Sequence, residues 1–152
     1  MVLTQKESML IEDLKNEEKI CIEKYQKHSS EAKAQQLKDL FNEIAGVEKK
    51  HLSMLDSITD GTVPTLQGGG GQNNSSAFKA TYNMNDEPNK QCDAYLCSDL
   101  LATEKHASGL YDTCVFEFKD QGIRDVLNHI QKEEQNHGKK IYDYMSVNSM
   151  YS

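Results

Sequence analysis

Two copies of the pattern Glu-x-x-His, Glu48 to His51 and Glu134 to His137, are the residues of this sequence best suited to chemistry. On an α-helix this spacing places the carboxylate and the imidazole on one face, where both can bind the same divalent metal ion. Each pair is preceded, 30 residues earlier, by a further glutamate, Glu18 in one case and Glu104 in the other. The pattern predicts one metal site built from four carboxylates and two imidazoles.

The chain repeats itself at an offset of 86 residues, which aligns Asp13–Tyr25 with Asp99–Tyr111. The same register continues without a gap through the second half of each copy. It pairs the candidate ligands Glu18 with Glu104, Glu48 with Glu134, and His51 with His137. A register shared over this length indicates that each half of the chain is one copy of the same structural unit.

Each copy contains two stretches of helical periodicity with a polar break between them, which predicts two αα-hairpins at about residues 4–59 and 88–146. Thr4 and Glu7 fit a capping box at the first helix start, and Asp120 fits the N-cap of the last helix. Thr59–Gly61 fits the end of the second helix. Residues 1–148 are expected to form one domain, and the tail 147–152 is expected to fray.

Residues 60–87 separate the two hairpins and contain Gly68–Ser76, a flexible polar tract that is typical of a linker. A helix of about 25 residues is about 38 Å long, and an extended linker of this size reaches roughly 90 Å. The sequence therefore predicts an all-α, four-helix bundle with a long crossover between the second and third helices, the ferritin-like topology. A homodimer that exchanges hairpins between two chains would use the same packing.

Apolar residues at steps of three and four mark the buried face of each predicted helix. All six candidate ligands fall on these faces, as Glu48 and His51 do between Ile44 and Leu55. Four buried carboxylates destabilise a fold unless cations or protons neutralise them. One glutamate from each of two helices, with Glu-x-x-His from the other two, is the dimetal-carboxylate arrangement. We expect two divalent ions, iron or manganese; the alternative is a degenerate site that protons neutralise.

Tyr25 and Tyr111 follow Glu18 and Glu104 by seven residues, or two helical turns. Their hydroxyls are placed to hydrogen-bond a ligand carboxylate, or else they belong to core tyrosines with another partner. Glu17 and Glu133 adjoin the candidate ligands but lie off the apolar faces, and we expect them to be solvated. Three further histidines have no counterpart in the other repeat and are not expected to bind metal: His28, His106 and His129.

Composition excludes several classes of partner. The 24 acidic residues outnumber the 17 Lys and Arg, giving a net charge of −7, so binding to nucleic acid or anionic lipid is not expected. No stretch has the roughly 20 apolar residues of a membrane helix, and the N-terminus does not resemble a signal peptide, which predicts an intracellular protein. The four cysteines are expected to be reduced, unliganded thiols.

The segment Cys97–Met145 closely resembles the Coat F family of spore coat proteins, above all in its DLLATEKH opening and its IQKEEQNHGKKIYDYM ending. The chain as a whole resembles the ferritin-like superfamily more broadly. The resemblance implies a protein made in the cytoplasm during sporulation and deposited in the spore coat beside other coat proteins. The six ligands also resemble those that hold iron in rubrerythrin. That family has an additional carboxylate where this chain has Ala107, and a four-cysteine rubredoxin module that this chain lacks.

Two functional hypotheses follow. In the first, the bundle is a building block of the coat, and metal neutralises the core acids. In the second, the chain is a soluble, rubrerythrin-like dimetal oxidoreductase that acts on peroxide or O₂.

Overall fold

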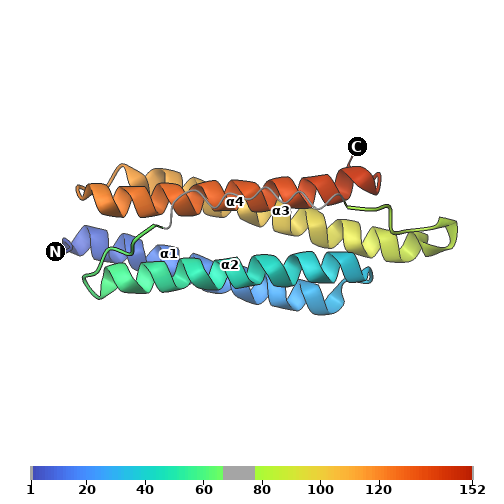
Figure 1. Ribbon diagram of the computed structural model, residues 1–152, viewed down its shortest axis with the longest axis horizontal. Helices are drawn as coiled ribbons and strands as arrows, with labels where there is room; N and C mark the ends of the chain where they lie inside the picture. Colours follow the sequence, from blue (N-terminus) through green and yellow to red (C-terminus); the bar gives the residue numbers. More distant parts are fainter. Residues whose placement is uncertain (1, 67–77, 152) are drawn as a thin grey trace.

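A computed structural model describes residues 2–66 and 78–151 of this chain, and four long α-helices account for most of them (Figure 1). The Gly68–Ser76 tract lies outside the described residues. Within the described ranges there is no strand, so the prediction of an all-α four-helix bundle is confirmed. The helices are α1 (Gln5–Glu31), α2 (Gln35–Thr59), α3 (Glu87–Val115) and α4 (Gln121–Val147), with a 3₁₀ turn, η1 (Met84–Asp86), directly before α3.

Local sequence signals set the helix ends. The Thr4 side chain accepts a hydrogen bond from Glu7 N, and the Glu7 carboxylate accepts one from Thr4 N, which confirms the predicted capping box. Asp120 caps α4 by accepting from Ile123 N. Helix α2 ends at Thr59, and Gly61 then takes φ 91°, a conformation that favours glycine. The predicted helix starts and stop are therefore confirmed.

The helices form two antiparallel hairpins, α1 with α2 and α3 with α4, that pack on each other (Figure 1). Helix α2 ends at one end of the bundle, where Val63 approaches Gly122 at the start of α4. Helix α3 begins at the opposite end, where the Phe78 and Tyr144 rings pack edge to face. The connection between α2 and α3 therefore crosses the length of the bundle, as the sequence predicts. None of the described helices is long and apolar enough to span a membrane.

The core consists of two apolar clusters with a polar layer between them. One cluster, around Phe41 and Leu100, lies toward the α1–α2 turn. The other, around Leu55 and Leu127, lies toward the α3–α4 turn. Because both clusters exclude water, any charged group in the layer between them has protein atoms rather than solvent as its surroundings.

Each hairpin caps the turn of the other through one carboxylate. Asp93 of α3 is fully buried and accepts hydrogen bonds from Lys33 N (2.8 Å) and Ala34 N (3.0 Å) at the α1–α2 turn. Glu7 of α1 accepts from Lys119 N (3.4 Å) at the α3–α4 turn. Asp93 and Glu7 are equivalent positions of the repeat, as are Lys119 and Lys33. The two turns are thus held by reciprocal contacts that no local capping signal reveals.

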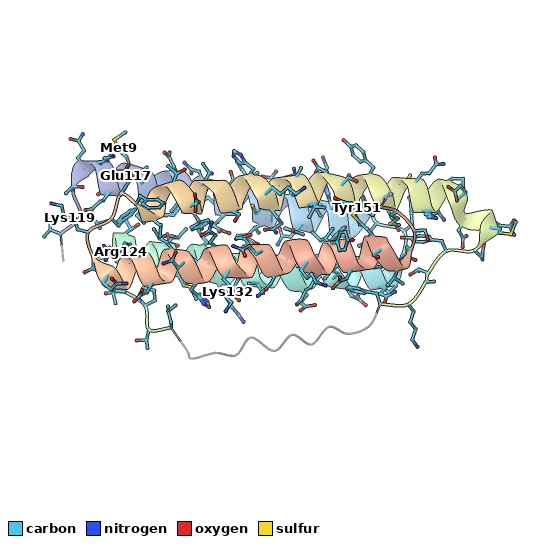
Figure 2. All side chains as sticks on the ribbon, turned by 90° about the horizontal axis from the view of Figure 1, so that it is seen from above. Met9, Glu117, Lys119, Arg124, Lys132 and Tyr151 are labelled. Carbon is cyan, nitrogen blue, oxygen red and sulfur yellow. The ribbon has the colours of Figure 1, made fainter. Side chains whose placement is uncertain are left out.

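The two ends of the bundle carry further backbone contacts. At the α3–α4 turn, where Figure 2 shows Lys119 and Arg124, the Arg124 guanidinium donates to Phe118 O (2.8 Å). Tyr151 lies toward the opposite end in the same view. Just before it, Asn148 is buried and accepts a hydrogen bond from Thr81 N (2.8 Å). The hydrogen bond from Thr81 N to Asn148 holds the beginning of the tail, which was expected to fray, against the bundle.

Candidate metal centre

The six predicted ligands come together in the polar layer at the middle of the bundle. Glu18 comes from α1, Glu48 and His51 from α2, and their repeat equivalents from α3 and α4. All six are buried, with exposed fractions of 4% or less: Glu18, Glu48, His51, Glu104, Glu134 and His137. Periodicity alone sends these side chains inward, and the packing of the two hairpins brings them to one level.

The cluster contains two overlapping groups of four side chains. In each group, one candidate donor atom per residue lies within 4.8 Å of the others. One group consists of Glu18, Glu48, His51 and Glu134, and the other of Glu48, Glu104, Glu134 and His137. Each group thus has a histidine and a glutamate of its own, while Glu48 and Glu134 belong to both. This is the donor distribution of a pair of ions that share two carboxylates.

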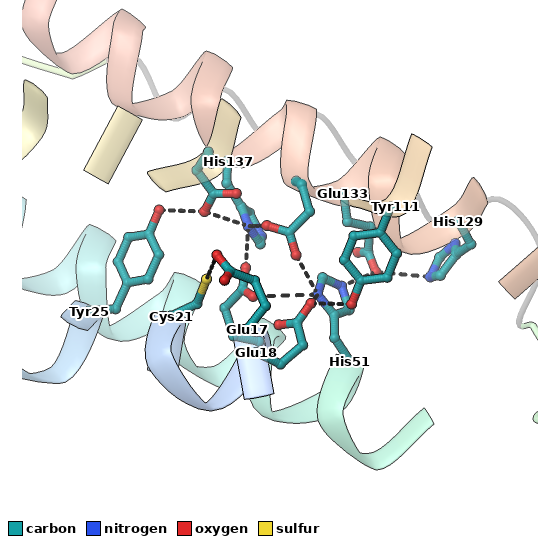
Figure 3. Close-up of polar contacts among 12 residues, drawn as sticks. Glu17, Glu18, Cys21, Tyr25, His51, Tyr111, His129, Glu133 and His137 are labelled. Carbon is teal, nitrogen blue, oxygen red and sulfur yellow. Dashed lines mark hydrogen bonds and ion pairs between the residues drawn. The ribbon is translucent and has the colours of Figure 1, made fainter. Parts of the chain in front are cut away.

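The imidazoles point their Nδ1 atoms into the cluster and reach across to the opposite hairpin. His51 Nδ1 lies 3.1 Å from Glu134 Oε1, and His137 Nδ1 lies 2.8 Å from Glu48 Oε1 (Figure 3). The two rings are roughly parallel, with centroids 6.0 Å apart. Because the contacts are equivalent under the repeat, the cluster has an approximate twofold symmetry.

Tyr25 and Tyr111 each donate a hydrogen bond of 2.5 Å to a cluster carboxylate, and in both cases the acceptor lies on the other hairpin. Tyr25 Oη donates to Glu104 Oε1, and Tyr111 Oη donates to Glu18 Oε1. Both rings are fully buried. The sequence left open whether these hydroxyls bond a ligand carboxylate or another partner, and the structure gives both of them a cluster carboxylate. The hydroxyls hold the two unshared glutamates in fixed orientations.

Burial and mutual contact shift the ionisation of the cluster strongly. Burial raises the pKa of Glu18 to about 8, and it also raises the pKa of Glu134 well above its usual value. Burial acts against the charged form of His51 and His137, but hydrogen bonds to the surrounding carboxylates outweigh it and raise the pKa of both imidazoles. Without a cation, protons must therefore supply the positive charge that these carboxylates require.

Several cluster atoms form no well-directed hydrogen bond among the residues that the structure describes, although His137 Nδ1 and Glu48 Oε1 lie close enough for an ion pair. They are His137 Nδ1, both carboxylate oxygens of Glu48, and Oε2 of Glu18, Glu104 and Glu134. Buried polar atoms in proteins are nearly always satisfied, and lone pairs that converge without donors are typical of a site for a cation. Carboxylate oxygens with imidazole nitrogens suit iron and manganese. The side chains present thus fit two such ions.

Glu133 corrects an expectation from the sequence. Its side chain is only 34% exposed, and Oε1 lies 3.0 Å from His51 Nε2 and 2.9 Å from His129 Nε2. A carboxylate at Nε2 favours a proton on that nitrogen, so the neutral form of the His51 imidazole directs its Nδ1 lone pair into the cluster. The His129-x-x-x-Glu133 spacing, which puts both side chains on one helix face, was a signal for the contact between His129 and Glu133.

Glu17 also differs from expectation, since it is buried with 9% of its surface exposed. It lies beside the buried Cys21, whose Sγ donates to Glu17 Oε1 (3.9 Å). Burial and the nearby acids raise the pKa of the Cys21 thiol, so it stays protonated. Outside the cluster, His28 Nε2 pairs with Asp99 (2.7 Å). All four cysteines are free thiols in the structure.

Comparison with known protein families finds a match to part of the chain. Residues 92–152, which include most of α3 and all of α4, match the Coat F domain. No curated protein and no solved structure matches the chain. The matched residues form most of the second hairpin and include the candidate metal ligands Glu104, Glu134 and His137. The match supports the resemblance of that half of the chain to the Coat F family.

Proposed function

We propose that this chain is a spore coat protein of ferritin-like fold whose bundle core binds two divalent metal ions, iron or manganese. The Coat F match over the second hairpin supports the coat assignment. The observation that carries the metal assignment is the convergence of four buried carboxylates and two imidazoles with oxygens that lack donors. Four carboxylates carry a charge of −4, which two divalent ions balance.

The side chains have distinct tasks in this proposal. Glu48 and Glu134 would contribute oxygens to both ions, because they belong to both groups of donors. His51 and Glu18 complete one site, and their repeat equivalents complete the other. Tyr25 and Tyr111 orient the unshared glutamates. When bound, such an ion pair supplies Lewis acidity and redox chemistry, and in a coat building block it also neutralises the core acids.

We expect about two metal ions per chain when the protein is expressed with added iron and manganese and analysed for its elements. The double variant Glu48→Ala/Glu134→Ala removes both shared carboxylates and should lose the metal. The matched control, Glu23→Ala/Glu43→Ala, removes two carboxylates outside the cluster and changes the net charge equally. Metal-free wild-type protein, or metal retained in the Glu48→Ala/Glu134→Ala variant, would refute the proposed site.

The coat assignment makes a separate prediction about location. Antibodies against this chain should detect it in coat extracts of purified spores of the bacterium that encodes it. The mother-cell cytoplasm of the same culture provides the comparison. Recovery only in the soluble cytoplasmic fraction would contradict the coat assignment and would leave the metal assignment untouched.

A further inference from the structure

A surface groove of about 460 Å³ runs between α3 and α4 and reaches the metal centre. Its floor includes Glu104 and Glu134, two of the four cluster carboxylates. Its walls include Leu101, Lys105, Ser108, Gly109, Asp112 and Gly138. The groove therefore ends against two cluster side chains that are themselves almost fully buried.

The two carboxylates on the floor each have one oxygen without a hydrogen-bond partner among the residues described, and both of these oxygens are buried. The oxygen is Oε2 in each case, and Glu104 is 2% exposed and Glu134 is 0% exposed. Asp112 adds a third acidic group, against the single cation of Lys105. Acidic residues thus outnumber basic residues in the lining of the groove. Such a surface attracts a cation toward the cluster.

The two hairpins differ in the residues that cover the cluster on their outer faces. At the positions equivalent to Ser108 and Gly138, the first hairpin has Ile22 and Leu52. Both of these larger apolar side chains are partly buried. The ligands on the two hairpins are the same, so the difference lies in the covering residues. Gly138 and Ser108 leave the α3–α4 face open where the α1–α2 face carries isoleucine and leucine.

We propose that the α3–α4 groove is the access route by which divalent ions reach the cluster, and that Gly138 keeps it open. The inference rests on the metal binding proposed above. Glycine inside a helix is less favourable than alanine, so its presence there calls for a reason. A Cβ at position 138 would meet only Leu101 Cδ1 at an ordinary 3.5 Å, so close packing does not require glycine there. A leucine side chain at this position projects into the groove and narrows it.

The test is the rate at which metal-free protein takes up Co²⁺, followed by stopped-flow absorbance. In Gly138→Leu, which copies Leu52 of the first hairpin, we expect uptake to slow by about tenfold or more, the factor that a barrier higher by about 1.4 kcal/mol produces. The final number of bound ions should be unchanged, because no ligand is altered. Gly46→Leu is the matched control, since Gly46 is an exposed helical glycine on α2 where a Cβ would meet no atom within 4 Å.

The outcomes separate this inference from the proposal beneath it. Wild-type protein that takes up no Co²⁺ overturns both. The access route is overturned if Gly138→Leu takes up Co²⁺ as fast as the wild-type protein. It is also overturned if Gly46→Leu slows uptake as much as Gly138→Leu does. In both cases the proposed metal site is unaffected. If circular dichroism shows that Gly138→Leu does not fold, Gly109→Leu serves instead, because a Cβ there meets no atom within 4 Å. Unchanged uptake in that variant overturns the access route in the same way.

Discussion

Loading the metal-free protein with Mn²⁺ is expected to raise its Tm by about 8–16 °C for each ion bound. An ion present at about 1,000 times its Kd stabilises the folded state by about 4 kcal/mol. In a chain of this size, 1 kcal/mol corresponds to about 2–4 °C. The physical reason is that the folded bundle assembles four carboxylates from four helices, whereas the unfolded chain disperses them. The measurement is thermal unfolding by circular dichroism with and without a chelator.

The double variant Glu48→Ala/Glu134→Ala is the control for this shift. It keeps the helices but removes the carboxylates that both ions share, so its Tm should be the same with Mn²⁺ and with chelator. The comparison uses the shift within each protein, because removing buried acids also changes the stability of the metal-free state. A wild-type Tm that does not respond to Mn²⁺ would argue against metal binding in the core.

The variant Asp93→Ala is expected to lower the free energy of unfolding by about 3–5 kcal/mol, or the Tm by roughly 10 °C. Asp93 is fully buried and accepts from Lys33 N, Ala34 N and Tyr82 Oη, the last at 2.6 Å. Alanine would leave Lys33 N and Ala34 N without this acceptor, and Tyr82 Oη would keep only Tyr144 Oη as a partner. It would also remove the side chain that caps the start of α2, whose own N-cap residue, Ala34, makes no such bond. Chemical denaturation gives the free energy directly.

Two variants sharpen this measurement. Asp93→Asn keeps one carbonyl oxygen as an acceptor and should lose less stability than Asp93→Ala. Glu7→Ala removes the equivalent residue of the repeat, whose contact with Lys119 N is longer and more exposed, so its loss should also be smaller. A loss below about 1 kcal/mol for Asp93→Ala would show that water replaces the missing carboxylate.

Helix positions and the inward direction of the six ligands were predictable from the sequence because both depend on local geometry. A helix repeats every 3.6 residues, so Glu48 and His51 share a face wherever that helix lies. Thr4, Asp120 and Gly61 act on backbone groups within a few residues of themselves. The repeat also predicted that the ligands of the two hairpins meet, since the spacing of 30 residues between the two glutamates is the same in both hairpins.

Contacts between residues distant in sequence were not predictable in the same way. Glu133 follows no apolar pattern, yet it contacts His51 because α4 packs beside α2 at that level. Tyr25 bonds Glu104 rather than a residue of its own hairpin. These partners depend on the angle and offset between helices and on side-chain rotamers, which are properties of packing.

The sequence by itself determined four helices in two equivalent hairpins, and six candidate metal-binding side chains on their buried faces. Periodicity and repetition are one-dimensional, so both are readable along the chain. Only the tertiary structure decided that Glu48 and Glu134 are shared between two groups of donors, that Asp93 and Glu7 cap the opposite hairpins, and that a groove opens beside Gly138. These features arise where helices pack against one another, because the distances across those contacts follow from the packing and not from the order of residues along the chain.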